Sequence, residues 1–231
     1  MARELFLYIS EKIGGESFHT FNEITTLAPH YNSDKFFFVQ IGANDGKTGD
    51  PLHKFVMKYH WSGLLVEPVK EYYSMLQQTY AGNTNLVFEN AAISEKNQQK
   101  TMYRIRNDVK HIPKGLQGIA SFDKSVLLRH NFILPDFESY ITEEKVDCVT
   151  LKELLKKHDV EKIDLLCLDT EGYEFKILKQ LDTVKVKPHI IFYEHKHLND
   201  AERLECEQFL TGLGYAMMKK FDNTIAYQKT A

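Results

Sequence analysis

Length, composition and charge set broad limits on what this chain can be. Its 231 residues suit one large α/β domain, and a hydrophobic content of 43% supplies enough apolar surface for a packed core. The 29 Lys and Arg residues against 32 Asp and Glu residues leave a formal charge of −3, without the basic surplus of a protein that wraps a polyanion. We therefore expect a single domain over residues 1–231 that does not bind nucleic acid.

The cysteines and the N-terminal sequence favour an intracellular protein. Cys148, Cys167 and Cys206 show no metal-binding spacing, and we interpret them as reduced core thiols. The apolar patch over residues 5–9 is short and flanked by acidic residues, unlike a signal peptide. No run approaches the ~20 apolar residues that a membrane-spanning helix needs. We expect a soluble, cytoplasmic protein without membrane contact.

The first predicted elements alternate in type. Residues 2–14 predict a short helix within an N-terminal extension over residues 1–34. Residues 36–41 (FFFVQI) form a nearly continuous apolar run, as expected of a strand covered on both faces. Strands over 63–66 and 86–90 and helices over 50–60 and 69–80 follow. This alternation is typical of a parallel sheet with helices on both faces.

The alternation breaks at residues 95–145 and then resumes. This segment predicts a strand over Met102–Arg106 followed by a loop-rich insertion. Predicted elements after it are helices over 150–158, 174–181 and 199–213 and strands over 163–168 and 189–193. Two extended runs, Tyr215–Lys219 and Thr224–Gln228, flank a short turn and predict a terminal antiparallel hairpin.

The segment after the first predicted strand suggests a nucleotide-type site. Gly42 and Gly46 would let the backbone approach a ligand, and the N-terminus of the next helix would attract its anionic group. That group is pyrophosphate in a dinucleotide enzyme and the methionine carboxylate in an enzyme of S-adenosylmethionine (SAM). Asn44 stands where a dinucleotide pattern needs a further glycine, which weakens the dinucleotide interpretation.

Two further strand ends fit an adenosyl ligand. Glu67 follows the second predicted strand, about 20 residues after the glycine-containing loop. This spacing is typical of an acid that accepts hydrogen bonds from both ribose hydroxyls, and Pro68 ends the strand. A surface carboxylate at a turn is the alternative. At the end of the third strand, Asn90 could pair with a base edge, while Ala91 and Ala92 leave room for a flat ring.

Four motifs in order, VQIGANDG, GLLVEP, ENAAIS and LDTEGYE, resemble the FkbM family of SAM-dependent methyltransferases, and Gly118–Ser121 also fits a family segment. The resemblance implies a Rossmann-like, seven-stranded, mostly parallel sheet and methyl transfer to a hydroxyl group, often on a sugar or polyketide. Gln40 departs from the acid that many methyltransferases carry at that position. The residues expected to contact SAM are Gln40, Gly42, Ala43, Asn44, Asp45, Gly46, Glu67, Pro68, Asn90, Ala91, Ala92 and Asp169.

Methyl transfer to an alcohol needs an aligned acceptor and a general base. Asp169 and Glu194 follow the fourth and fifth predicted strands and should orient the acceptor, with Glu194 or His195 as the base. Glu171 and Glu174 could instead open the next helix, and we favour this for Glu174. Carboxylates there could also gather a divalent cation with His195, but the spacing fits no metal motif and no metal ligand is predicted.

The insertion over residues 95–145 would cover the same crevice as a lid that selects the acceptor. Its aromatic residues could stack on an acceptor ring or form a core of their own; they are Tyr103, Phe122, Phe132, Phe137 and Tyr140. Two other functions stay open. One is a nicotinamide-dependent oxidoreductase or epimerase, which the incomplete glycine pattern disfavours. The other is a non-catalytic SAM-binding protein, which Asp169 and Glu194 disfavour.

Overall fold

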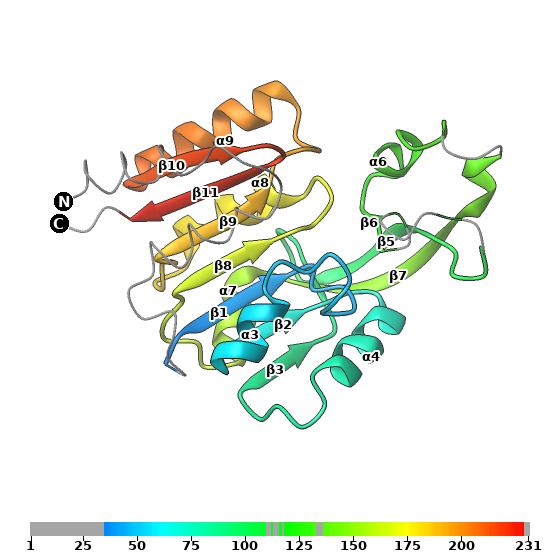
Figure 1. The fold of residues 1–231 in the computed structure, drawn as a ribbon. Coiled ribbons are helices and arrows are strands. Elements are labelled where there is room, and N and C mark those ends of the chain that lie inside the picture. Colours follow the sequence, from blue (N-terminus) through cyan, green and yellow to red (C-terminus); the bar gives the residue numbers. More distant parts are fainter. Residues whose placement is uncertain (1–34, 110–111, 113–115, 117, 133–135, 229–231) are drawn as a thin grey trace.

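The computed structural model describes residues 35–109, 112, 116, 118–132 and 136–228, and its main feature is a seven-stranded sheet (Figure 1). The strand order is β10-β11-β9-β8-β1-β2-β3. The strands are β1 (Phe37–Ile41), β2 (Ser62–Val66), β3 (Leu86–Glu89), β8 (Leu165–Leu168), β9 (Ile190–Glu194), β10 (Tyr215–Lys220) and β11 (Asn223–Gln228). The strands from β9 to β3 are parallel, and β10 and β11 form an antiparallel hairpin at the β9 edge. This confirms the predicted fold class. The predicted helix over 2–14 and the extension over 1–34 lie outside the described residues.

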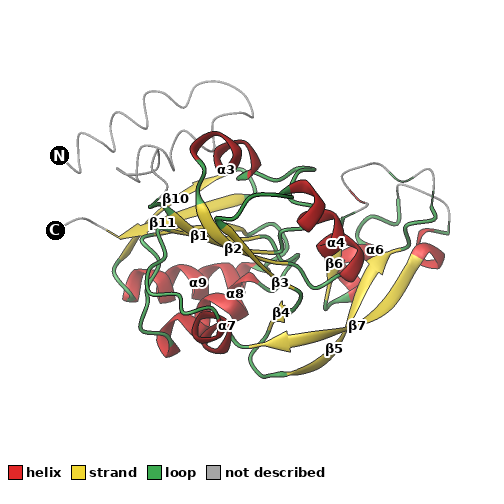
Figure 2. Ribbon diagram, turned by 90° about the horizontal axis from the view of Figure 1, so that it is seen from below, coloured by secondary structure: helices red, strands yellow, loops and turns green. Residues whose placement is uncertain are grey.

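Helices cover both faces of this sheet (Figure 2). On one face lie α3 (His53–Tyr59) and α4 (Lys70–Thr79); on the other lie α7 (Leu151–Lys157), α8 (Glu174–Leu178), its 3-10 extension η2 (Lys179–Thr183) and α9 (Asp200–Gly212). Alternation along β1 explains this: Phe38 packs toward α3, whereas Val39 and Ile41 pack toward α7 and α8. All three are at most 2% exposed. In the described part of the chain, no helix has the length and apolar character to cross a bilayer.

A second, smaller sheet projects beside the first (Figures 1 and 2). Its strands, in the order β4-β7-β5-β6, are β4 (Ala92–Ile93), β7 (Ile141–Val149), β5 (Gln98–Ile105) and β6 (Ala120–Ser121). β5 lies where a strand over Met102–Arg106 was predicted, and the described residues between β5 and η1 are mostly loops and turns, as expected, but β7 was not predicted. In β7, exposed Glu143, Lys145 and Asp147 alternate with buried Val146 and Cys148, which is the pattern of a strand with one solvated face and is the signal that could have predicted it.

The second sheet has a core of its own. A helix, α6 (Lys124–Leu128), and a 3-10 turn, η1 (Phe137–Tyr140), pack on it. Phe137 is buried in this core, with Tyr103 and Tyr140 packed around it. Three of the five aromatic residues expected in the insertion thus stabilise it. Phe132 is 81% exposed, and Phe122 alone of the five faces the ligand cavity described below.

The carboxyl ends of the central strands meet at one edge of the main sheet. The N–H groups of Gly42 and Ala43 donate to Val66 O at 3.0 and 3.1 Å, and Asp169 N donates to Ile41 O at 3.0 Å. These bonds hold the loops after β1, β2 and β8 side by side. In open α/β sheets, this edge is where ligands bind.

Candidate active site

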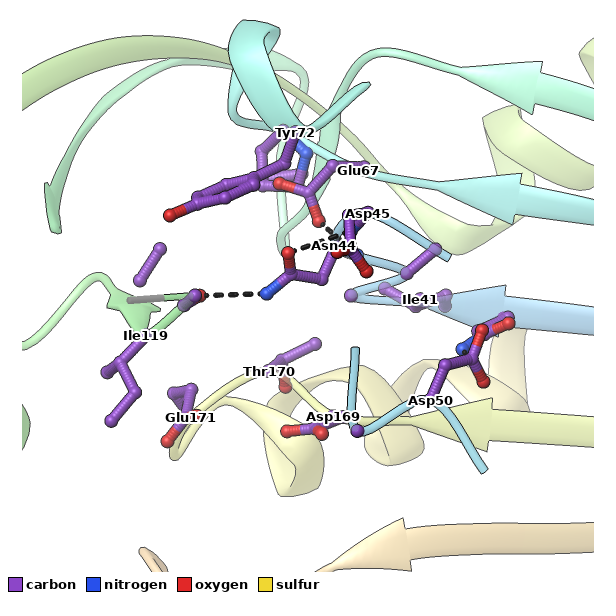
Figure 3. Close-up of a pocket in the computed structure, with 18 of the residues that line it drawn as sticks. Ile41, Asn44, Asp45, Asp50, Glu67, Tyr72, Ile119, Asp169, Thr170 and Glu171 are labelled. Atoms are coloured by element: carbon purple, nitrogen blue, oxygen red, sulfur yellow. Dashed lines mark hydrogen bonds between the residues drawn. The ribbon is translucent and has the colours of Figure 1, made fainter. Parts of the chain in front are cut away.

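A cavity of about 630 Å³ lies over the tips of β1, β2 and β8, between the main sheet and the second sheet (Figure 3). Its volume is in the range of cofactor sites, about 300–1,000 Å³. Glu67 and Tyr72 line one side, and Asp169, Thr170 and Glu171 line the opposite side. The other predicted cofactor residues on its wall are Gln40, Gly42, Ala43, Asn44, Asp45, Pro68 and Ala92.

The loop after β1 depends on close backbone contact. Gly42 has φ +83°, and a Cβ atom there would stand 1.8 Å from Asp169 O. Only glycine therefore lets the β1 and β8 tips approach this closely. Asn44, with φ +49°, donates from Nδ2 to Gly118 O at 3.2 Å and ties this loop to the second sheet.

This loop does not lead directly into a helix, contrary to the expected anion site at a helix N-terminus. The next helix, α3, starts only at His53. The N–H groups of Gly42 and Ala43 bind Val66 O, Asn44 N donates to Glu67 Oε2, and Gly46 N donates to Ala43 O at 2.9 Å. These amides therefore brace the neighbouring strand tips and each already has a protein acceptor.

Glu67 is only 5% exposed yet lines the cavity. Its Oε2 accepts from Asn44 N and its Oε1 accepts from Val69 N, both at 2.8 Å. Burial raises the pKa of Glu67 to about 7, against the lowering effect of these two bonds. Because each carboxylate oxygen has two acceptor sites, Glu67 retains capacity for two ligand hydroxyls.

Gln40 and Asp50 form an acceptor pair at another part of the cavity wall. Gln40 Nε2 donates to Asp50 Oδ1 at 3.2 Å. Gln40 Oε1 and Asp50 Oδ2 are buried without a hydrogen-bond partner among the described residues. Burial raises the pKa of the Asp50 carboxyl. Unsatisfied buried acceptors are costly, so this pair suits a ligand with several N–H donors. Asp50 was not predicted as a site residue because its segment resembles the start of a helix, whereas α3 begins only at His53.

Carboxylates accumulate around the β8 and β9 tips. Loss of solvation, together with Glu171 and Glu174, raises the pKa of Asp169 to about 8. Burial, followed by repulsion from Asp169 and Glu171, raises the pKa of Glu194 to about 9. Glu174 is buried and accepts from Thr170 N at 2.7 Å and Gly172 N at 3.0 Å, so it organises the turn before α8 as the helix-opening interpretation expects.

Two predicted catalytic residues, Glu194 and His195, do not line the cavity. His195 Nδ1 lies 2.9 Å from Thr224 Oγ1, and its carbonyl accepts from Arg203 Nε at 3.1 Å. Burial lowers the pKa of His195. It is His197 whose imidazole faces the acids, with Nε2 2.9 Å from Glu171 Oε2. Both histidines follow β9, and the sequence could not show which one turns inward.

Two residues expected at the adenine position are also away from the cavity wall. Asn90 Nδ2 donates to Glu67 O at 2.8 Å and to Pro68 O at 3.1 Å, so its amide group ties the β3 tip to the β2 tip. Ala91 is buried beside it and does not line the cavity. Of Asn90, Ala91 and Ala92, Ala92 alone lines the cavity.

The fold and this site define the class. A seven-stranded sheet that ends in an antiparallel hairpin, with a cavity over its central strand tips, is the Rossmann-like fold of SAM-dependent methyltransferases. The family model for the methyltransferase FkbM domain matches residues 40–217. The chain belongs to the FkbM methyltransferase family.

Solved structures of methyltransferases and related proteins are similar at low identity. FkbM methyltransferase from Methylobacillus flagellatus is 13% identical with a TM-score of 0.48, over 84% of this chain and 44% of that one. This chain thus spans less than half of that protein. A precorrin-6y C5,15-methyltransferase from Geobacter metallireducens is 9% identical with a TM-score of 0.47, over 94% and 91%. A fibrillarin pre-rRNA processing protein from Methanococcus jannaschii is 12% identical with a TM-score of 0.43, over 85% and 68%. No curated protein sequence matches significantly.

Proposed function

We propose that this protein transfers a methyl group from SAM to a hydroxyl group of a small molecule, of the sugar or polyketide type. The observation that carries the proposal is one cavity that joins a buried carboxylate, Glu67, to an unsatisfied acceptor pair, Gln40 and Asp50. These are the partners that a ribose diol and an amino-acid ammonium group need. Membership of the FkbM family supports the same cofactor.

The residues present fit SAM at two ends. Glu67 would accept hydrogen bonds from the ribose hydroxyls while it keeps its bonds to Asn44 N and Val69 N. Gln40 Oε1 and Asp50 Oδ2 would accept from the ammonium group, which supplies the donors that they lack. A nicotinamide dinucleotide has no ammonium group to satisfy this pair, which favours SAM over the oxidoreductase alternative.

The protein's part in the reaction would be positioning and proton transfer. When bound, SAM would supply a methyl group on a sulfonium sulfur, which would pass in line to the acceptor oxygen as the sulfur leaves as a neutral thioether. Asp169 lies on the cavity wall opposite Glu67 and would orient the acceptor hydroxyl and take its proton. Glu194 and His195 are away from the wall, so we assign neither as the base.

An adjoining cavity of about 290 Å³ extends the space available for an acceptor. Phe122 and Tyr173 line both cavities, with ring centroids 4.9 Å apart in an edge-to-face arrangement. Lys100 Nζ lies 3.0 Å from Tyr173 Oη and 4.0 Å from the centre of the Phe122 ring. Aromatic faces and hydrogen-bonding groups together suit a hydroxylated ring. We propose that the second sheet selects the acceptor through this wall.

The test is methyl transfer from labelled SAM to a panel of glycosides and hydroxylated polyketides, with a short RNA as a further acceptor. The proposal expects product with at least one hydroxylated small molecule and none with RNA. Asp169→Asn should lower kcat by about 10²–10⁴-fold while SAM binding persists. Methylated RNA, or full activity in Asp169→Asn, would contradict the proposed acceptor or the proposed base. SAM binding without any turnover across the panel would favour a non-catalytic SAM-binding protein.

A further inference from the structure

Three side chains from separate segments meet beside the main cavity. Glu171 lies in the loop after β8, Glu194 ends β9, and His197 lies in the turn before α9. One oxygen of each carboxylate and one nitrogen of the imidazole all lie within 4.8 Å of one another. His197 Nε2 is 2.9 Å from Glu171 Oε2 and 3.7 Å from Glu194 Oε2.

Hydrogen bonding does not account for this cluster. The His197 side chain is only 4% exposed, and its Nδ1 is buried without a hydrogen-bond partner among the described residues. Glu171 Oε2 is likewise buried and accepts no hydrogen bond from them, so its 2.9 Å contact with Nε2 is not aligned as one. A nearly buried imidazole whose Nδ1 has no partner among the described residues thus points Nε2 at two carboxylates.

Another histidine–glutamate pair shows how such a contact is satisfied without an additional ligand. His158 Nε2 lies 2.8 Å from Glu89 Oε2 and forms a hydrogen bond with it. Lys157 Nζ donates to both oxygens of Glu89, at 2.8 and 2.7 Å. Within the described part of the chain, neither Glu171 nor Glu194 has a Lys or Arg nitrogen within 4.0 Å. Among the residues that the structure describes, the cluster therefore lacks both the histidine–glutamate hydrogen bond and the direct lysine contacts that satisfy Glu89.

We propose that Glu171, Glu194 and His197 bind a divalent transition-metal ion such as Mn²⁺. Carboxylates suit hard ions such as Mg²⁺ and Mn²⁺, whereas imidazole suits transition metals, and Mn²⁺ accepts both. Two ligand atoms 2.9 Å apart match neighbours that share an ion at about 2.1 Å. Three protein ligands leave coordination positions open, as catalytic metal sites do.

The position of the metal site suits a role in methyl transfer. This part of the inference rests on the proposed function. Glu171 lines the main cavity, and His197 lines the adjoining one. Ser121 Oγ, on the second sheet, donates to Glu171 O at 2.8 Å and holds the Glu171 backbone between the two cavities. An ion here would coordinate the acceptor oxygen beside Asp169 and favour its deprotonation.

The experiment titrates the full chain with Mn²⁺ in the absence of SAM and acceptor. The electron paramagnetic resonance signal of free Mn²⁺ measures how much of the ion is bound at each step. The wild type should bind one Mn²⁺, and Glu171→Gln and His197→Ala should each weaken this binding at least tenfold. His158→Ala, which breaks the pair at Glu89, is the matched control and should bind Mn²⁺ as the wild type does. Circular dichroism checks the fold of each variant, and the isosteric Glu171→Gln serves if His197→Ala does not fold.

Failure of the metal site and failure of the proposed function give different results. No saturable Mn²⁺ binding by the wild type, or equal binding by Glu171→Gln, would overturn the site even if SAM binds. An imidazolium held only as an ion pair would give this result. Mn²⁺ binding that depends on Glu171 and His197 supports the site, even in a protein that fails to bind SAM.

Discussion

Glu67 keeps a carboxylate almost wholly out of water while both of its oxygens accept backbone N–H bonds. Burial disfavours the charged form and the two bonds favour it, and the balance places its pKa at about 7. In the unfolded chain, the same group has an ordinary pKa of 4.5. The folded protein therefore holds one more proton than the unfolded chain between these two values.

This difference predicts a pH dependence of stability. Because the folded state binds the extra proton, the free energy of unfolding of the SAM-free protein should fall as pH rises from 4.5 to about 7. At about 1.4 kcal/mol per pKa unit, the contribution of Glu67 is about 3 kcal/mol. Urea denaturation across this range should show a smaller decrease in Glu67→Gln than in the wild type. Parallel curves for the two proteins would show that Glu67 has an ordinary pKa in the fold.

Residue roles could be predicted where a strand end fixes the position of one side chain. Glu67 follows β2 directly, so its place at the cavity wall was predictable from the sequence. Asn90 also follows its strand, but its amide group turns back to two carbonyls, and only the tertiary structure reveals that. The choice between His195 and His197 depends on the path of the β9–α9 turn and was beyond the sequence.

At the scale of elements, the tip of β1 is fixed by contact with β8. The positive φ of Gly42 and the 1.8 Å clash of any Cβ with Asp169 O are separate reasons for glycine there. Gly49, in the same loop, also has a positive φ of +71°, but a Cβ there would meet nothing within 4 Å. A comparison of alanine variants at the two glycines therefore distinguishes the cost of the backbone conformation from the cost of the steric clash.

Gly42→Ala should destabilise the protein by at least about 2 kcal/mol and weaken SAM binding, because the β1 and β8 tips must separate. Gly49→Ala should cost about 1 kcal/mol, from the backbone conformation alone. Thermal unfolding of both variants measures the difference. A Gly42→Ala protein as stable as Gly49→Ala would mean that the two tips are not packed as the structure has them.

The helix α9 begins with a reciprocal cap. Asn199 Oδ1 accepts from Glu202 N at 3.0 Å, and Glu202 Oε2 accepts from Asn199 N at 3.1 Å. Asn199→Ala should lower the stability by about 1 kcal/mol, which is about 2–4 °C in Tm for a chain of this size. Glu202→Gln keeps the reciprocal pattern and should change Tm less. Scanning calorimetry of the two variants makes the comparison, and an unchanged Tm in Asn199→Ala would refute the cap.

The elements of the main sheet were predictable, and the strand pairing of the second sheet was not. The continuous apolar run of β1 indicates a strand buried on both faces. The sequence of α9 indicates both ends of the helix, with a capping Asn199 before it and Gly212 at its end. β7 carries charged residues along one solvated face and follows a segment rich in turn residues, so its local sequence does not reveal its partner. β5 and β7 pair across more than 30 residues, and that long-range pairing defines the sheet.

For the whole molecule, the two sheets together enclose the ligand space. The main sheet supplies Glu67 and Asp169 from its strand tips and Asp50 from the loop before α3, and Gly118 and Phe122, which flank β6 of the second sheet, close the cavity. The proposed cofactor end of the cavity thus belongs to the part that the family pattern predicts. The proposed acceptor end belongs to the part whose strand pairing the sequence left open, which is why the class of reaction was easier to predict than the acceptor.

Isothermal titration of the purified protein with SAM tests the central claim most directly. The wild type should bind one SAM and no NAD, and Glu67→Gln should bind SAM about 10–100-fold more weakly through loss of charged hydrogen bonds to the ribose. Glu89→Gln, which changes a carboxylate at the adjacent strand end that binds Lys157 and His158, should leave SAM affinity unchanged. Absence of SAM binding, or equal affinity in the wild type and Glu67→Gln, would contradict the account.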